Sequence, residues 1–284
     1  YWMHASNIWY NMNFTFLNML VVALKDVPSF VDVKYEEKKS LYNATKDKKY
    51  LIREPSLYDP IYRMNLEKKV KSDVELAVSW GGAYAYVVGD EMSLTNYVEY
   101  FDYDFSEYSQ AEFRNWCQGK YGSIAQLNAL WGTNYTSWQD IVPLTLEEAR
   151  INNKPAPWAD FRTFTDDGMV DFFKFVSNTV KSVDPNGKLG ISGTQKPAAA
   201  NGYDYWKWAK NGIFEFMNTY NSRTWLIEVW RSFNKDRKIY MTPYRAGYAA
   251  GSGKHAEYDM WWSLFHAPSG ISAWASNNFL WNDY

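Results

Sequence analysis

Two adjacent carboxylates close a hydrophobic run near residue 90. Residues 86–93 read YVVGDEMS, in which β-forming residues are followed by Asp90 and Glu91. Burying a charge is costly unless the charge is paired or used, and a carboxyl group held at the end of a strand can serve as a general acid or base. Glu91 is therefore the first candidate catalytic residue. The alternative is an ordinary carboxylate that pairs with an arginine or caps a helix.

The rest of the sequence gives no sign of a metal or nucleotide site. The three histidines are scattered, and neither HxH nor CxxC spacing occurs, so we expect no catalytic metal. No G-x-G-x-x-G or Walker sequence is present, so no cofactor is predicted. The formal net charge is −2 and no long basic run occurs, which argues against a nucleic-acid partner.

Aromatic residues are abundant, and carbohydrate binding is one of the roles that they can serve. The chain has 15 Trp and 23 Tyr, and aromatics make up 19 % of its residues. Aromatic rings stack on the apolar faces of sugars, and their polar atoms bond hydroxyl groups. An aromatic core or an interface of a homo-oligomer or larger assembly is the alternative. The longest apolar stretch, residues 16–24, is too short to span a membrane and is interpreted as a core helix or strand.

Strand and helix patterns alternate along the chain. Asp59 and Pro60 predict the start of a helix that ends near residue 80. Ser109 and Glu112 predict a capping box opening a pair of helices that Gly122 separates. Further helices are expected at 165–188, 203–211, 223–236 and 255–267, and strands at 83–89, 188–193, 213–220, 238–244 and 270–276.

This alternation predicts parallel βα units closed into one α/β domain, a (β/α)₈ TIM barrel over residues 1–284. Residues 36–58 and 133–164 have weak periodicity and are interpreted as long loops on the active face. No low-complexity linker divides the chain.

The segment from residue 89 to 140 resembles the catalytic barrel of family 42 β-galactosidases. The resemblance rests on GDEMSLTNY at 89–97 and on a set of shorter matches: Phe113–Trp116, Lys120–Gly122, Leu127–Asn128, Trp131–Thr133 and APWADFRTFTDD at 156–167. It implies a (β/α)₈ glycosidase with one catalytic glutamate after strand four and another after strand seven. Glu91 matches the first of these, the general acid/base. If Glu91 ends strand four, about ninety residues precede it, so we expect one or two N-terminal strands to lie outside this chain.

The sequence departs from this family pattern at two positions. Asp90 stands where the family has an asparagine that bonds a sugar hydroxyl, and an ionised Asp cannot donate. Thr242 occupies the expected nucleophile position, and no carboxylate occurs between Lys238 and Tyr248. Glycoside hydrolysis needs a second carboxylate about 5–9.5 Å from the first. Glu215 is the leading substitute, followed by the other candidates, Glu257, Asp283 and a tyrosine nucleophile at Tyr244.

Several further residues are candidates for substrate binding. Tyr220 ends a predicted strand and would orient the second carboxylate, and Arg245 would bind an anionic sugar or pair with an acid. Trp274 and Trp281 flank the mouth of the last strand. Trp206, Trp208, Trp261 and Trp262 are further stacking candidates.

The resemblance, taken with these residues, implies a hydrolase of β-galactoside-like O-glycosidic bonds acting on an oligo- or polysaccharide, with an extracellular or cell-surface location favoured. The rival is a catalytically inactive barrel that binds carbohydrate or serves in a structural or surface assembly.

Overall fold

The computed structural model describes residues 21–23, 32–83, 85–96, 99–198, 200–220, 225–234, 238–242, 261–262, 264–266 and 270–271. Within them, strands and helices alternate as the sequence predicts. No helix in this part of the chain is both long enough and apolar enough to cross a membrane.

Six parallel strands form one sheet. Each strand pairs with the next along the chain, in the order β1-β2-β3-β4-β5-β6. Sequential order without reversal is the order found in (β/α)₈ barrels, whereas doubly wound sheets reverse direction at a switch point. The strands are β1 (Val21–Ala23), β2 (Ala85–Asp90), β3 (Leu189–Ser192), β4 (Phe216–Tyr220), β5 (Lys238–Thr242) and β6 (Gly270–Ile271).

All five strands predicted after residue 80 are confirmed, although β2, β3 and β4 begin one to three residues later than expected. Of the apolar stretch at residues 16–24, the described residues Val21–Ala23 form β1, as expected for the strand alternative. Parallel neighbours need a crossover connection between them, and the intervening helices supply it: α3 (Pro60–Ser79), α7 (Pro155–Val183), α8 (Tyr205–Lys210) and α9 (Trp225–Phe233).

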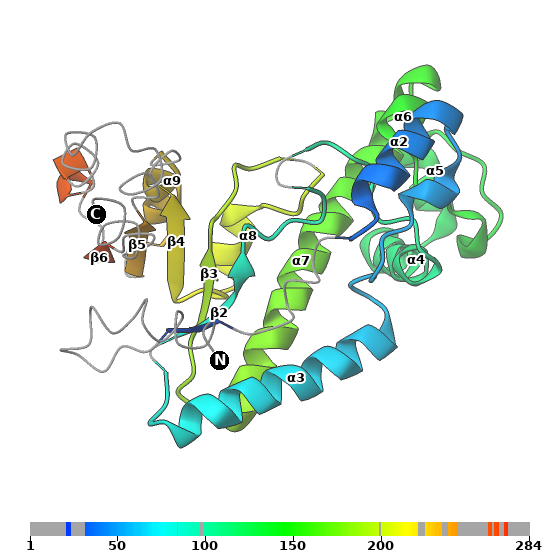
Figure 1. The fold of residues 1–284 in the computed structure, drawn as a ribbon. Helices are drawn as coiled ribbons and strands as arrows, with labels where there is room; N and C mark the ends of the chain where they lie inside the picture. Colours follow the sequence, from blue (N-terminus) through cyan, green and yellow to red (C-terminus); the bar gives the residue numbers. More distant parts are fainter. Residues whose placement is uncertain are drawn as a thin grey trace.

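A continuous hydrophobic core joins the sheet to these helices. Val70 and Val74 of α3 and Val176 of α7 are fully buried and belong to one cluster with Tyr86 of β2 and Ile191 of β3. The helix α3 begins as predicted, because the Asp59 carboxylate accepts hydrogen bonds from the backbone N–H groups of Ile61 and Tyr62 at 2.8 and 3.4 Å. Figure 1 shows α3 and α7 crossing each other beside the sheet.

A helical lobe lies at the N-terminal half of α7, away from β4, β5 and β6 (Figure 1). It consists of segments that follow β1 and β2, and it has its own aromatic core, which includes Phe101, Phe113, Trp131 and Phe161. Its elements are α2 (Tyr35–Thr45), η3 (Lys48–Leu51), α4 (Glu107–Tyr121), α5 (Ile124–Trp131), η4 (Trp138–Asp140) and α6 (Leu146–Ile151).

The lobe corrects three predictions. Residues 36–58 and 133–164 contain helices rather than long loops. In α2 only Tyr35, Lys38 and Tyr42 are buried, so its hydrophobic periodicity is weak although it is helical. The predicted capping box is also wrong: Ser106 is the N-cap of α4, and its hydroxyl accepts from the backbone N–H of Ser109 at 3.2 Å.

Candidate functional site

Glu91 lies directly after the last residue of β2, at the carboxyl edge of the sheet. Its backbone N–H donates to the Ser192 carbonyl at 3.2 Å, so β3 holds the peptide at the end of β2. Its φ is +50°, a left-handed conformation that non-glycine residues seldom adopt and that concentrates at functional sites. The structure therefore gives Glu91 a fixed and unusual backbone position at the edge where (β/α) enzymes carry their active sites.

The residues after Glu91 are buried, whereas Glu91 itself is partly exposed. Met92, Ser93, Leu94 and Thr95 each expose 5 % or less of their surface. The Thr95 hydroxyl donates to the Glu99 carbonyl at 2.8 Å and its backbone N–H donates to the Ser93 hydroxyl at 3.2 Å. Residues 92–95 are therefore buried directly after the partly exposed Glu91.

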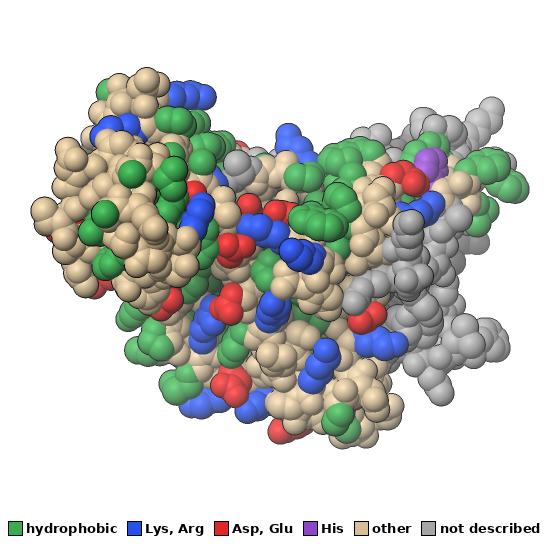
Figure 2. Space-filling model, turned by 180° about the vertical axis from the view of Figure 1, so that it is seen from behind, with side chains coloured by type: hydrophobic (Ala, Val, Ile, Leu, Met, Phe, Trp, Pro, Cys, Tyr) green, Lys and Arg blue, Asp and Glu red, His purple; other side chains and the backbone are tan. Residues whose placement is uncertain are grey.

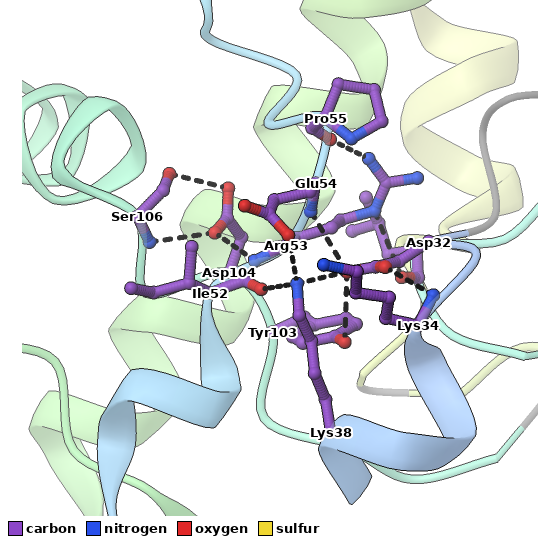
Figure 3. A network of polar contacts seen from close by, with 11 residues as sticks. Asp32, Lys34, Lys38, Ile52, Arg53, Glu54, Pro55, Tyr103, Asp104 and Ser106 are labelled. Atoms are coloured by element: carbon purple, nitrogen blue, oxygen red, sulfur yellow. Dashed lines mark hydrogen bonds and ion pairs between the residues drawn. The ribbon is translucent and has the colours of Figure 1, made fainter.

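A network of polar and charged groups, buried except for the exposed Glu54, connects the segment after β1 to the segment after β2 (Figure 3). The Lys38 ammonium group donates to Asp32, to Glu54 and to the carbonyl of Ile52, each at 2.8 Å. Burial raises the pKa of Asp32, but hydrogen bonds from Lys38 and from backbone N–H groups outweigh it and hold that pKa below its usual value. Burial lowers the pKa of Lys38, but its bonds to Asp32 and Glu54 leave that pKa above the ordinary value.

Arg53 extends this network toward Glu91. The Arg53 side chain is buried, and its Nε donates to the Leu94 carbonyl at 3.2 Å. Its backbone N–H donates to Asp104 at 3.0 Å, and the same carboxylate accepts from the Ser56 hydroxyl at 2.6 Å. Sequence reasoning missed Arg53, because it lies in a stretch with no periodic pattern and its partners are far along the chain.

The structure does not bring Glu215 near Glu91. Glu215 precedes β4, and its backbone N–H donates to the carbonyl of Leu189 at 2.9 Å. Leu189 begins β3 and Ser192, the partner of Glu91, ends it. At about 3.3 Å per residue, the two backbone sites are separated by roughly 10 Å along the strands, in addition to the spacing between strands. Glu215 is at the amino edge of the sheet, so its predicted pairing with Glu91 lacks structural support.

Three other predicted residues end strands at the same edge as Glu91. Asp90 ends β2, Tyr220 ends β4 and Thr242 ends β5, with Tyr220 and Thr242 in register. Their side chains are not among those that the structure describes. The remaining candidates lie outside the described residues altogether: Tyr244, Arg245, Glu257, Trp274, Trp281 and Asp283.

The tryptophan candidates divide by exposure. Trp208 is fully buried in the sheet core, so its ring cannot stack on a sugar and that prediction is wrong. Trp206 is 54 % exposed and Trp261 56 % exposed, and Trp262 is partly buried with its ring stacked on His266. Trp206 lies edge-on to Phe233 with ring centroids 5.6 Å apart.

The surface charge of the described residues is mixed. Figure 2 shows acidic and basic side chains interspersed over the middle of the face opposite to that in Figure 1, without a broad area of one sign. Among the described residues, no group of three or more His, Cys, Asp or Glu side chains is placed to hold a metal ion.

A parallel sheet in sequential order, with a carboxylate directly after a strand, places the chain in the class of (β/α)-repeat proteins. The sequence model of a β-galactosidase family, glycoside hydrolase family 42, matches residues 57–282. The chain belongs to this family, and the resemblance read from its motifs is confirmed.

Known proteins show the extent of the similarity. A β-galactosidase of Planococcus sp. (strain L4), BgaP, is 32 % identical over 123 residues, which make up 39 % of this chain and 18 % of that protein. The crystal structure of a β-galactosidase from Marinomonas ef1 superposes with a TM-score of 0.60 at 16 % identity, covering 77 % of this chain and 37 % of the other. An exo-carrageenase of family 42 from Bacteroides ovatus gives 0.61 at 20 % identity, covering 77 % and 35 %.

These matches therefore include well under half of each relative. The two structures share the fold with this chain, at identities too low to carry more than that.

Proposed function

We propose that this chain is part of a glycoside hydrolase that cleaves β-galactoside-like O-glycosidic bonds, with Glu91 as the general acid/base. The observation that supports it most is the position of Glu91 directly after β2, at the carboxyl edge of a parallel sheet in a member of a β-galactosidase family. The aromatic-rich composition agrees with an oligo- or polysaccharide substrate.

The six strands correspond, in this proposal, to strands three to eight of a (β/α)₈ barrel. Glu91 then follows strand four and Thr242 ends strand seven, as the family pattern requires of its two catalytic positions. In the described sheet β1 pairs only with β2, and β6 only with β5. Two further strands between β6 and β1 would complete the barrel.

Glu91 would act first as an acid. Its protonated carboxyl group would give its proton to the glycosidic oxygen as the bond to the anomeric carbon breaks, and the leaving sugar would depart as an alcohol. The resulting carboxylate would then take a proton from water, which adds its oxygen to the anomeric carbon. The same side chain thus returns to its starting state.

A second carboxylate would stabilise the positive charge that develops at the anomeric carbon. With Glu215 at the amino edge, Glu257 is the next candidate, because it lies in the sequence between Thr242, which ends β5 at the carboxyl edge, and Trp261 and Trp262, which are described as helical. The family position itself is occupied by Thr242.

The lack of a carboxylate between Lys238 and Tyr248 favours a second candidate function. A barrel with an acid but without its partner would bind carbohydrate in a cleft and not hydrolyse it. This alternative needs neither Glu257 nor Glu91 for ligand affinity.

Hydrolysis of aryl and alkyl β-galactosides and of galactan oligosaccharides, with and without sulfate, separates the two functions. We expect Glu91→Gln to lower kcat/KM by about 10²–10⁴-fold, the usual contribution of a general acid. Glu257→Gln should lower it by at least as much. Glu215→Gln is the matched control, because its carboxyl group is at the opposite edge, and it should retain wild-type activity.

Two outcomes would contradict the proposal. A wild-type chain that binds these sugars and hydrolyses none of them would support the binding function. Loss of activity in Glu215→Gln, with full activity in Glu91→Gln, would place the chemistry at the other edge of the sheet.

A further inference from the structure

The segment that follows β3 packs tightly against the segment that follows Glu91. At their contact stands Gly202, whose φ is +74°. A Cβ at this position would lie 2.2 Å from Cγ of Met169 and 3.3 Å from Cδ1 of Leu94. Only glycine combines this φ with so close an approach, so the turn at residues 200–203 is built to press against α7 and against the segment after Glu91.

Tyr203, the next residue, reaches from this turn to the carbonyl group of Met92. Its hydroxyl donates a hydrogen bond to that carbonyl oxygen. Tyr203 is 3 % exposed and Met92 is 2 % exposed, so the bond is shielded from water. The tyrosine ring is itself fixed, because its centroid lies 4.8 Å from that of Trp208 and 5.9 Å from that of Tyr205.

Glu91 is thus held from both sides by one stretch of chain. The peptide before it donates to the Ser192 carbonyl at 3.2 Å, and the peptide after Met92 accepts from Tyr203. Between these two bonds lies the left-handed backbone of Glu91, at φ +50°. A non-glycine residue in this region is under strain and persists only where its surroundings impose it.

We propose that Tyr203 is a positioning residue for the Glu91 carboxyl group, an inference that rests on the proposed function of Glu91. The hydroxyl of Tyr203 fixes the Met92 carbonyl, and through it the left-handed backbone conformation of Glu91. An acid displaced by about 1 Å loses up to a hundredfold in rate, since proton transfer depends on geometry.

The pair Tyr203→Phe and Tyr205→Phe tests this inference. Tyr205 is the matched control: it is 2 % exposed, its centroid lies 5.1 Å from that of Trp208, and its hydroxyl also donates to a buried carbonyl, that of Gln195. Both variants remove one buried hydroxyl from the same aromatic cluster. We expect Tyr203→Phe to lower kcat by about tenfold to a hundredfold with KM changed less than twofold, and Tyr205→Phe to leave both near wild type.

Hydrogen–deuterium exchange of the peptide at residues 88–95 gives a readout that does not depend on activity. Exchange should accelerate there in Tyr203→Phe and stay at the wild-type rate in Tyr205→Phe. If wild type hydrolyses no glycoside, the proposed function fails while exchange still reports whether Tyr203 holds this segment. The positioning role would be overturned by equal exchange rates or equal kcat in the two variants. It would also be overturned if Tyr203→Phe failed to fold while Tyr205→Phe folded.

Discussion

Asp32 and Lys38 form an ion pair in which both side chains are shielded from solvent. The carboxylate side chain is 1 % exposed and the lysine side chain 11 % exposed, with 2.8 Å between Nζ and Oδ2. Asp32 also accepts from the backbone N–H groups of Lys34 and Glu54 at 2.9 and 3.0 Å. Asp32 therefore links Lys38 and Glu54 within the segment after β1. Arg53, next to Glu54 in the sequence, in turn donates to the Leu94 carbonyl in the segment after Glu91.

Removing the Asp32 charge should destabilise the fold in a pH-dependent way. At pH 7 we expect Asp32→Asn to lower the free energy of unfolding by about 1.5–3 kcal/mol, because Lys38 loses its buried partner and keeps only the more exposed Glu54 carboxylate, also at 2.8 Å. The pKa of Asp32 is lowered in the folded state, so its contribution is present above its unfolded pKa of about 3.9 and is lost as pH falls through the folded pKa. Urea unfolding of wild type and Asp32→Asn measures the difference in free energy of unfolding at pH 7 and at pH 3.

The difference between wild type and Asp32→Asn should therefore shrink at pH 3. Lys38 has a raised pKa, so its own contribution is present below about pH 10.4 and is lost only as pH rises through the folded value. Glu147→Gln is the control, because the Lys46–Glu147 pair has both side chains about half exposed and should contribute little. If Asp32→Asn were as stable as wild type at pH 7, the Asp32–Lys38 pair would not stabilise the fold.

At the scale of elements, α7 depends on a glycine for its packing. Gly168 faces Tyr58, and a Cβ there would lie 2.0 Å from the tyrosine hydroxyl oxygen. Gly119, in α4, is exposed and has no atom within 4 Å of the equivalent position. Both glycines are helical, so they differ only in how much room the surrounding atoms leave for a Cβ atom.

Alanine should have opposite effects at these two glycines. Gly168→Ala should destabilise by about 1–3 kcal/mol through overpacking, whereas Gly119→Ala should stabilise by about 0.5–1 kcal/mol through helix propensity. Thermal unfolding of both variants at neutral pH checks the pair. A stabilised Gly168→Ala protein would mean that Tyr58 does not pack against α7 as described.

The sequence predicted elements whose signals are local. The cap at Asp59 and Pro60 located α3, and compact β-forming runs located β2, β3, β4, β5 and β6. It missed α2 and the first ten residues of α7, because charged residues occupy part of the buried face, Lys38 in α2 and Asp160 and Arg162 in α7, and interrupt the apolar pattern. The position of Glu91 was predictable because its strand has a local signal. The contacts of Arg53 and Tyr203 were not predictable, because their partners, Leu94 and Met92, lie 41 and 111 residues away in the sequence.

Glu215 shows a different limit of the sequence. Its strand was predicted correctly over 213–220, but β4 begins only at Phe216. Both ranges end at Tyr220, so Glu215 stands five residues before the carboxyl edge of the sheet in either case. A catalytic role depends on which edge of the sheet a residue occupies, and the predicted strand already placed Glu215 toward the amino edge.

At the scale of the whole molecule, the proposed barrel makes a direct structural prediction. We expect an experimental structure to show β1 and β6 each paired on its second side with a further parallel strand, giving eight in all. Direct pairing of β6 with β1, or a helix covering either edge, would contradict the assignment of Glu91 to strand four.

The central claim is that Glu91 donates a proton to the leaving group. The most direct measurement is the dependence of kcat/KM on leaving-group pKa, for wild type and Glu91→Gln, over aryl and alkyl β-galactosides. A good leaving group departs without a proton, so we expect a shallow dependence in wild type and a steep one in Glu91→Gln, with rates nearly equal for dinitrophenyl galactoside. Parallel dependences, with the same loss for every leaving group, would contradict the acid role of Glu91.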